Sequence, residues 1–173
     1  MKIYITGLGI ISAIGNNIKE NYLSLSDGKT GIQKIKYLPF DSVVLTGEVK
    51  LSNDELIEKL NLKNGLYSRT SLLGMVAAQE SWGKNLLNQN IRTGIISATS
   101  VGGMDKSEKY YRQVLQKEKE DISLILTHDS GNTTEKIADL LGISGYINTL
   151  STACSSSANA IMLAARLIEQ NKL

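Results

Sequence analysis

Short apolar runs alternate with amphipathic helical segments along this chain, and this alternation constrains the fold more than any other feature. Strands are predicted at residues 2–6, 43–49, 91–99 and 146–150. Helices are predicted at about 17–26, 52–60, 68–87, 133–141 and 158–170, with a polar connector at 124–132. Residues 104–119 are predicted as a charged helix or a helix plus loop. Because strands covered on both faces are apolar throughout, the pattern predicts an α/β fold with a mostly parallel sheet between helices.

The composition is that of an ordinary globular protein, with 42% hydrophobic and 21% charged residues. The net charge of +2 and the absence of a basic arm give no reason to expect nucleic acid or an anionic membrane as partner. No run approaches the roughly 20 apolar residues of a membrane span, and no basic cluster precedes the apolar residues 3–14. We predict a cytoplasmic protein with no membrane span.

The only cysteine, Cys154, lies where strand 146–150 gives way to a helix of small residues. One cysteine excludes an internal disulfide and a CxxC metal site, and it fits a reducing compartment. At the first turn of a helix, unpaired N–H groups and the helix dipole favour the thiolate, which is the nucleophilic form. A buried structural thiol is the alternative, since free cysteine also behaves as a small hydrophobe. The flanking small hydroxyl residues favour the nucleophile.

Two glycine pairs need a separate interpretation. Gly7-Leu8-Gly9 follows a strand, as in dinucleotide-binding proteins, but Ser12 replaces the third glycine and no acidic residue closes a second strand. A structural turn is the better interpretation there. Gly102-Gly103 follows strand 91–99, where the pair either lines a ligand site or serves a turn, and the sequence leaves both open.

The other chemically active residues give weaker signals. His128, the only histidine, is the one candidate base for a Cys–His hydrolase, although a lone loop histidine is usually solvated. The acid pairs Glu118/Glu120 and Asp54/Glu55 lie on charged helices and are expected to face solvent. No metal-ligand cluster is present in the sequence, so no metal is predicted.

Five motifs in order resemble β-ketoacyl-acyl-carrier-protein synthases of the thiolase-like superfamily. The run from Ser151 to Ala158, S-T-A-C-S-S-S-A, is similar to the active-site motif of these ketosynthases. The opening run Ile5 to Gly15 resembles "VTGLGxVSPxG", with Ala13 where proline is usual. The others are Gly28 to Ile32, Gly94 to Met104 and Asn132 to Gly145, and Ser68 to Ser71 precedes the expected alanine-rich helix.

The resemblance implies a thiolase-like fold of two similar halves, each a five-stranded mixed sheet with helices on both faces. Residues 1–173 match the N-terminal half as a single domain. The family's second half carries two histidines and a lysine, and His128 matches neither histidine. We therefore expect that these residues alone lack condensing activity.

The resemblance also implies roles for particular residues. Cys154 would accept an acyl group from the phosphopantetheine of acyl carrier protein, and malonyl carrier protein would then condense with it after losing CO2. The Cys154 amide would donate to the oxyanion, Val101 would line the acyl pocket, and strand 146–150 would pair across a homodimer axis. No other cofactor is implied.

Two alternatives stay open at this point. A chain-length-factor-like partner subunit would form a ketosynthase heterodimer without chemistry of its own, but such partners usually lack the cysteine. An unrelated cysteine hydrolase would have to use His128, and the order of the motifs speaks against it.

Overall fold

The structure is a computed structural model that describes residues 2–37, 43–83 and 91–173. The described chain forms two compact units. One consists of residues 2–5, 64–75 and 91–173, and the other of residues 6–37, 43–63 and 76–83. Helix α3 (Arg69–Trp82) contributes its first half to one unit and its second half to the other.

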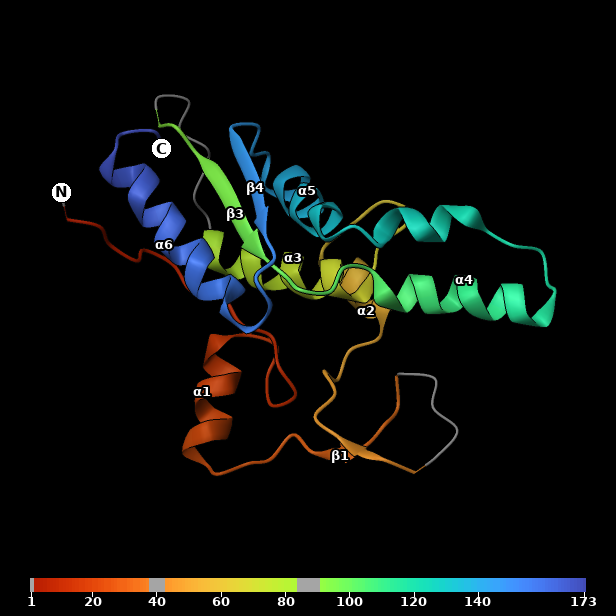
Figure 1. Ribbon diagram of the computed structural model, residues 1–173. Coiled ribbons are helices and arrows are strands. Elements are labelled where there is room, and N and C mark those ends of the chain that lie inside the picture. The colour runs from red at the N-terminus through yellow and green to blue at the C-terminus, as the bar shows by residue number, and fades with distance from the viewer. Residues whose placement is uncertain (1, 38–42, 84–90) are drawn as a thin grey trace. The chain divides into compact units, whose positions relative to one another are not determined.

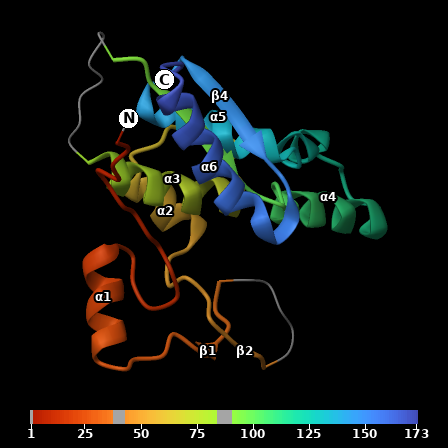
Figure 2. The same cartoon turned by 60° about the vertical axis from the view of Figure 1, so that its left-hand side comes forward.

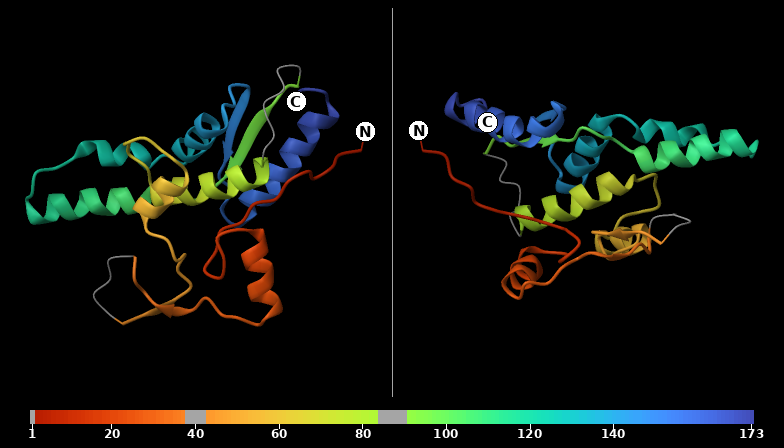
Figure 3. Two further views of the ribbon diagram at one scale, coloured as in Figure 1. Left: turned by 180° about the vertical axis from the view of Figure 1, so that it is seen from behind. Right: turned by 60° about the horizontal axis from the view of Figure 1, so that its bottom comes forward.

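The first unit is built on two parallel strands (Figure 1). Strand β3 (Gly94–Ala98) pairs with β4 (Tyr146–Leu150) in the register Gly94↔Tyr146 to Ala98↔Leu150. Helices α5 (Ser130–Leu141) and α6 (Ser156–Glu169) both pack on this sheet. They cover its opposite faces (Figure 3), and α6 runs alongside β4 (Figure 2). The arrangement is a small α/β layer structure, which the alternation of the sequence predicted.

A buried threonine joins α5 to both strands. The Thr134 hydroxyl, 1% exposed, forms hydrogen bonds with the hydroxyls of Ser97 on β3 and Thr149 on β4. Ser97 and Thr149 are direct partners in the sheet register. Because side chains alternate between the faces of a strand, both residues point to the α5 face. The contact therefore fixes the helix and the strand register together.

A helical hairpin follows β3 in the chain. Helix α4 (Met104–Gln116) packs against the 3-10 segment η1 (Ile122–Thr127), and no residue of α4 is buried. The Asp105 carboxylate of α4 accepts a hydrogen bond from the Arg69 backbone N–H at 3.1 Å, which caps the start of α3. Asp129 caps α5 in the same way, accepting from the Gly131 N–H at 2.7 Å.

The second unit contains helices α1 (Ile18–Ser26) and α2 (Asn53–Lys59). Its two strands, β1 (Gln33–Lys34) and β2 (Leu45–Thr46), are antiparallel. The carboxylate of Glu80, on the second half of α3, accepts backbone N–H groups from Ile10 at 3.0 Å and Ile18 at 2.8 Å. One side chain thereby holds both ends of the loop that precedes α1.

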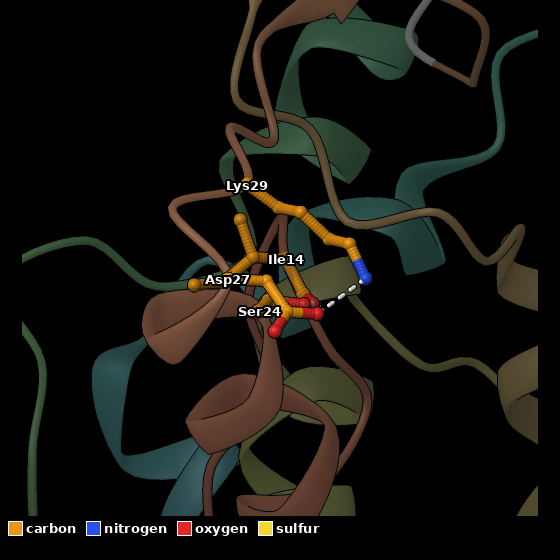
Figure 4. A network of polar contacts seen from close by, with 4 residues as sticks. All are labelled: Ile14, Ser24, Asp27 and Lys29. Atoms are coloured by element: carbon orange, nitrogen blue, oxygen red, sulfur yellow. Dashed lines mark hydrogen bonds and ion pairs between the residues drawn. The ribbon is translucent and has the colours of Figure 1, made fainter.

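Figure 4 shows the polar contacts around the end of α1. The Ser24 hydroxyl donates to the Ile14 carbonyl at 2.8 Å, which ties the helix to the preceding loop. Lys29 and Asp27 form an ion pair at 2.8 Å, but their side chains are 64% and 52% exposed. An ion pair so accessible to solvent contributes little to stability.

The buried apolar side chains are distributed over both units. In the first unit they are Leu72, Met75, Leu124, Ile137, Ala138, Ile143 and Ala160, and in the second Leu56, Leu60 and Val76. Within the first unit α3 packs closely on α5, because a Cβ added to Gly74 would lie 3.2 Å from Ile137 Cδ1. These contacts support the sheet from the α5 side.

The strands differ most from the sequence prediction. Among the described residues the structure has two two-stranded sheets, so the predicted five-stranded sheet is not confirmed. Residues 2–6 form no strand, and the side chains of Tyr4 and Ile5 are 72% and 81% exposed. An apolar run becomes a strand only where a neighbouring strand accepts and donates its backbone hydrogen bonds. The strand at 43–49 shortens to Leu45–Thr46, and that at 91–99 to Gly94–Ala98.

The helices follow the prediction more closely. The helix predicted at 68–87 occupies Arg69–Trp82, Gly83 follows with a positive φ of 62°, and residues 84–87 lie outside the described residues. The helix predicted at 104–119 ends at Gln116. The prediction of a polar connector at 124–132 is wrong, because Leu124 is buried in η1 and α5 begins at Ser130. No helix among the described residues is both long and apolar enough to cross a membrane.

Acidification tests the capping box of α2. The Glu55 carboxylate accepts the Ser52 N–H at 2.6 Å, and the Ser52 hydroxyl accepts the Glu55 N–H at 3.1 Å. The backbone N–H and then the side chain of Ser52 lower the pKa of Glu55 from 4.5. A lowered folded-state pKa gives stability that is present above pH 4.5 and is lost as the pH falls through the folded-state value.

We therefore expect Glu55→Gln to lose less stability than wild type between pH 7 and pH 3. Urea midpoints measured across this range test the prediction. Glu58→Gln is the matched control, since it removes an exposed carboxylate of the same helix that is not part of the capping box. Equal acid sensitivity of wild type and Glu55→Gln would contradict the assignment.

Candidate functional site

Cys154 lies on a tight turn between strand and helix. It is the middle residue of the 3-10 segment η2 (Ala153–Ser155), which connects β4 to α6. Helix α6 begins at Ser156, two residues before its predicted start, and Cys154 lies just before its N-cap Ser155 rather than in its first turn. The thiol is free and exposed. The alternative of a buried structural cysteine is therefore wrong for this chain.

The backbone of this turn is strained at Ala153. Its φ of 51° lies in the left-handed region, which costs a residue with a Cβ roughly 1–2 kcal/mol. The buried Ser156 holds this conformation in place. Its hydroxyl accepts the Thr152 N–H at 2.8 Å and donates to the Ala153 carbonyl at 2.7 Å. The first residue of α6 thus fixes the two residues before Cys154.

A second set of bonds lies on the exposed side of the turn. The Ser155 hydroxyl donates to the Thr152 carbonyl at 2.8 Å and lies 3.1 Å from the Thr152 hydroxyl. The side-chain amide of Asn159 donates to the Thr152 hydroxyl at 2.9 Å and to the Ser155 hydroxyl at 3.3 Å. The residues on both sides of Cys154 are therefore joined to one another and to α6.

The electrostatics of the turn favour an anion near Cys154. No side chain caps the N-terminus of α6, so its first-turn N–H groups have no side-chain oxygen as acceptor. The 14-residue helix directs its positive end toward the residues that precede it. An oxyanion that forms beside such a helix end is stabilised.

Val101 lies at the same edge of the sheet as Cys154. It follows β3 by three residues, and Cys154 follows the parallel strand β4 by four. The Thr99 N–H donates to the Leu150 carbonyl at 3.3 Å, which extends the pairing into both loops. Val101 is 44% exposed, and its carbonyl accepts from the Thr99 hydroxyl at 2.7 Å. The carboxyl edge of parallel strands is where open α/β sheets bind ligands.

The two glycine pairs have packing roles. Gly102 and Gly103 are buried against η1, and a Cβ on Gly102 would overlap the His128 carbonyl. The Gly103 N–H donates to the Thr127 carbonyl at 2.6 Å, and neither glycine has a positive φ. A Cβ on Gly7 or Gly9 would similarly overlap backbone atoms of α3 at Ser81 or Ala77. Close backbone approach explains all four.

The sequence did not predict a role for Ser156 or Asn159. The signal that identifies them is the density of hydroxyl and amide side chains around a helix start, where such groups satisfy free backbone atoms. Which of them bonds the turn depends on the backbone conformation at Ala153, which the sequence does not show.

His128 and the acidic pairs form no site with Cys154. The Nδ1 of the exposed His128 lies 2.9 Å from the Ser107 hydroxyl on α4, which is its hydrogen-bond partner. Glu118, Glu120, Asp54 and Glu55 are exposed, as expected. Within the described ranges no group of three or more metal-ligating side chains comes together.

Removing the Ser156 hydroxyl tests its role in holding the turn. Ser156→Ala removes two part-buried hydrogen bonds, to the Thr152 N–H and to the Ala153 carbonyl, each worth about 0.5–1.5 kcal/mol, so we expect the free energy of unfolding to fall by about 1–3 kcal/mol. Chemical denaturation measures the change. Ser157→Ala, which removes an exposed hydroxyl from the same turn, is the matched control and is expected to change stability little. Equal effects of the two variants would contradict this role.

Comparisons with known proteins identify the family. The family model "Beta-ketoacyl synthase, N-terminal domain" matches residues 1–173. The 3-oxoacyl-[acyl-carrier-protein] synthase 2 of Staphylococcus aureus strain MRSA252 is 28% identical over 181 residues, covering 98% of this chain and 43% of the relative. The enzyme of the same name from Vibrio harveyi is 26% identical, covering 96% and 42%. This chain therefore spans less than half the length of these relatives.

Solved structures share the fold. The ishigamide ketosynthase/chain length factor has a TM-score of 0.81 at 19% identity, covering 96% of this chain and 49% of that one. A β-ketoacyl synthase from Burkholderia phymatum STM815 has a TM-score of 0.64 at 16% identity, covering 96% and 43%. Because the family model matches residues 1–173, the chain belongs to the β-ketoacyl synthases and corresponds to their N-terminal domain.

Proposed function

We propose that this chain provides the acyl-accepting nucleophile of a β-ketoacyl-acyl-carrier-protein synthase, and that Cys154 is that nucleophile. The observation that carries the proposal is the exposed thiol on the turn before α6, within a chain that belongs to this family. The hydrolase alternative is set aside, because family membership and the His128–Ser107 contact both argue against it.

The proposed acyl transfer needs a thiolate and a reachable carbonyl carbon. The Cys154 thiolate attacks the thioester carbonyl of an acyl chain carried on the phosphopantetheine of acyl carrier protein. A new C–S bond forms, and the pantetheine thiolate leaves and takes up a proton. The N-terminus of α6 favours the attacking thiolate, and the Cys154 amide is the proposed donor to the developing oxyanion.

Condensation then consumes the acyl-cysteine. Malonyl carrier protein loses CO2, its enolate carbon attacks the Cys154 thioester, and the Cys154 thiolate departs from the β-ketoacyl product. The family resemblance assigns polarisation of the malonyl carbonyl to two histidines of a second half, and His128 is the only histidine of this sequence. We therefore propose that these 173 residues accept the acyl group but do not condense it.

Val101 and the acyl carrier protein complete the proposed site. The exposed Val101 side chain, at the same sheet edge as Cys154, would contact the acyl chain, where its branched side chain would limit chain length. The acyl carrier protein supplies the substrate, and no separate cofactor is proposed. The reaction belongs to fatty-acid or polyketide-type biosynthesis.

A chain-length-factor-like role is the second candidate. Two of the structures that share the fold are ketosynthase/chain length factor assemblies, the second being ApeO with ApeC from Xenorhabdus doucetiae, with a TM-score of 0.59. A ketosynthase-like heterodimer is therefore a reasonable assembly for this chain. The reactive position of Cys154 favours the catalytic subunit over the non-catalytic one.

Acylation of Cys154 tests the proposed function. Incubation with acyl carrier protein that carries a saturated acyl chain is expected to add the mass of one acyl group to the intact protein. Cys154→Ala is expected to show no adduct, whereas Ser157→Ala and His128→Ala are expected to react like wild type. Intact-mass spectrometry makes the measurement, with the epoxide cerulenin as a second reagent.

Three results would count against acylation of Cys154. No adduct from either reagent on wild type would reject acylation, and an adduct that persists in Cys154→Ala would assign it to another residue. Loss of the adduct in His128→Ala would favour the hydrolase-type couple instead.

We also propose that β4 is a pairing edge. Tyr146 and Ile147 are 39% and 42% exposed, and among the described residues β4 pairs on one side only, with β3. An exposed strand edge is a template for another strand.

If β4 pairs with β4 of a second copy, we expect sedimentation equilibrium to give twice the chain mass of 18.8 kDa. A mass that stays at 18.8 kDa at every concentration would contradict self-pairing.

A further inference from the structure

We propose that Asn159 is a positioning residue for Cys154, acting through the Thr152 hydroxyl. The inference rests on the proposed function, in which Cys154 is the nucleophile. Asn159 lies on α6 five residues after Cys154, and its side-chain amide donates to the hydroxyls of Thr152 and Ser155. These two residues flank the Ala153–Cys154 pair.

Asn159 is anchored by its position on α6. It is half-buried and lies between Ser156 and Ala160, which are 4% and 7% exposed. Helix α6 packs on both β3 and β4, so its first turns are held by the sheet. A donor anchored in this way can hold a turn that is itself exposed.

The turn from Thr152 to Ser155 needs stabilising contacts because its backbone conformation is unfavourable by itself. Ala153 has a φ of 51°, and Thr152, Ala153, Cys154 and Ser155 are all exposed. Ser156 secures the backbone on the buried side, as described above. On the exposed side, the bonds that reach from the body of α6 to the turn come from Asn159. Without them, the segment that carries the thiol is free to relax away from the end of α6.

The hydrogen-bond arrangement also gives Thr152 a defined orientation. Its hydroxyl oxygen accepts the Asn159 amide at 2.9 Å and lies 3.1 Å from the Ser155 hydroxyl, whose proton the Thr152 carbonyl accepts at 2.8 Å. The side chain of Thr152 is therefore fixed relative to Asn159. Since Thr152 N–H is bonded to Ser156, side chain and backbone of this residue are both held by α6.

The consequence concerns the reactivity of the thiol. The rate of attack depends on where the sulfur lies and how it is oriented toward an incoming electrophile, so a displacement of the strained turn that carries Cys154 lowers it. We infer that losing the Asn159 contact slows attack by Cys154 even where the fold is retained.

Alkylation by iodoacetamide tests the inference directly, because the chain has one cysteine and the rate reports Cys154 alone. Asn159→Leu keeps the size of the side chain and removes the donor, and Thr152→Val removes its acceptor. Each is expected to slow alkylation about 2- to 10-fold, the range that one hydrogen bond accounts for. Thr152→Ser keeps the hydroxyl and is expected to alkylate at the wild-type rate.

The double variant distinguishes positioning from a general weakening of the helix. If Asn159 acts through Thr152, Asn159→Leu with Thr152→Val slows alkylation no more than either single change. Ser157→Ala is the control in the same turn, and circular dichroism confirms that each variant is folded. If Asn159→Leu does not fold, the comparison of Thr152→Ser with Thr152→Val alone decides whether the Thr152 hydroxyl positions Cys154.

Rates that are unchanged or faster in Asn159→Leu would overturn the inference, as would a double variant whose loss is the product of the two single losses. Equal losses in Thr152→Ser and Thr152→Val would also overturn it. The outcome is separable from that of the proposed function, since iodoacetamide needs no acyl carrier protein. An Asn159-dependent alkylation rate without acylation would reject the proposed function and retain the positioning.

Discussion

The parallel pairing of β3 with β4 is the constraint on which the rest of the site depends. It brings the loops after both strands to one edge of the sheet, although Ala98 and Leu150 are far apart in the sequence. Thr134 of α5 bonds both strands at the register pair Ser97 and Thr149, and a slip of either strand by one residue would turn that strand's hydroxyl to the other face. Cys154 and Val101 owe their common location to this register.

The sequence was informative where local chemistry decides the structure. The helix starts at Asn17 and Ser52 follow from side chains that accept N–H groups, and strand 146–150 was predicted with its observed bounds. The α5 start at Asp129 was missed, because the helix was predicted to begin only at residue 133. The sequence was misleading at residues 2–6, because an apolar run does not specify which strand accepts its hydrogen bonds. The buried Leu124 of η1 was also missed, since the apolar run from Leu124 to Leu126 is too short to show a helical or strand period.

The candidate site was predictable in part for the same reason. Cys154 is identified by its uniqueness and by the strand-to-helix transition around it, and its exposure agrees with a nucleophile. Ser156 and Asn159 were not identifiable, because their importance depends on the left-handed backbone at Ala153. Hydroxyl and amide residues at a helix start usually serve as caps, yet α6 has no side-chain cap.

That difference connects the local structure to the chemistry. A capped helix would use its first-turn N–H groups on its own side chains, whereas α6 has no side-chain cap and its first N–H, that of Ser156, bonds the Ala153 carbonyl. The polar side chains around Cys154 instead bond to one another and to the backbone of the turn, through Ser155, Ser156 and Asn159. Their hydrogen bonds offset the strain at Ala153, and the helix dipole remains directed at the thiol. The turn is thereby held by hydrogen bonds that do not involve the Cys154 thiol.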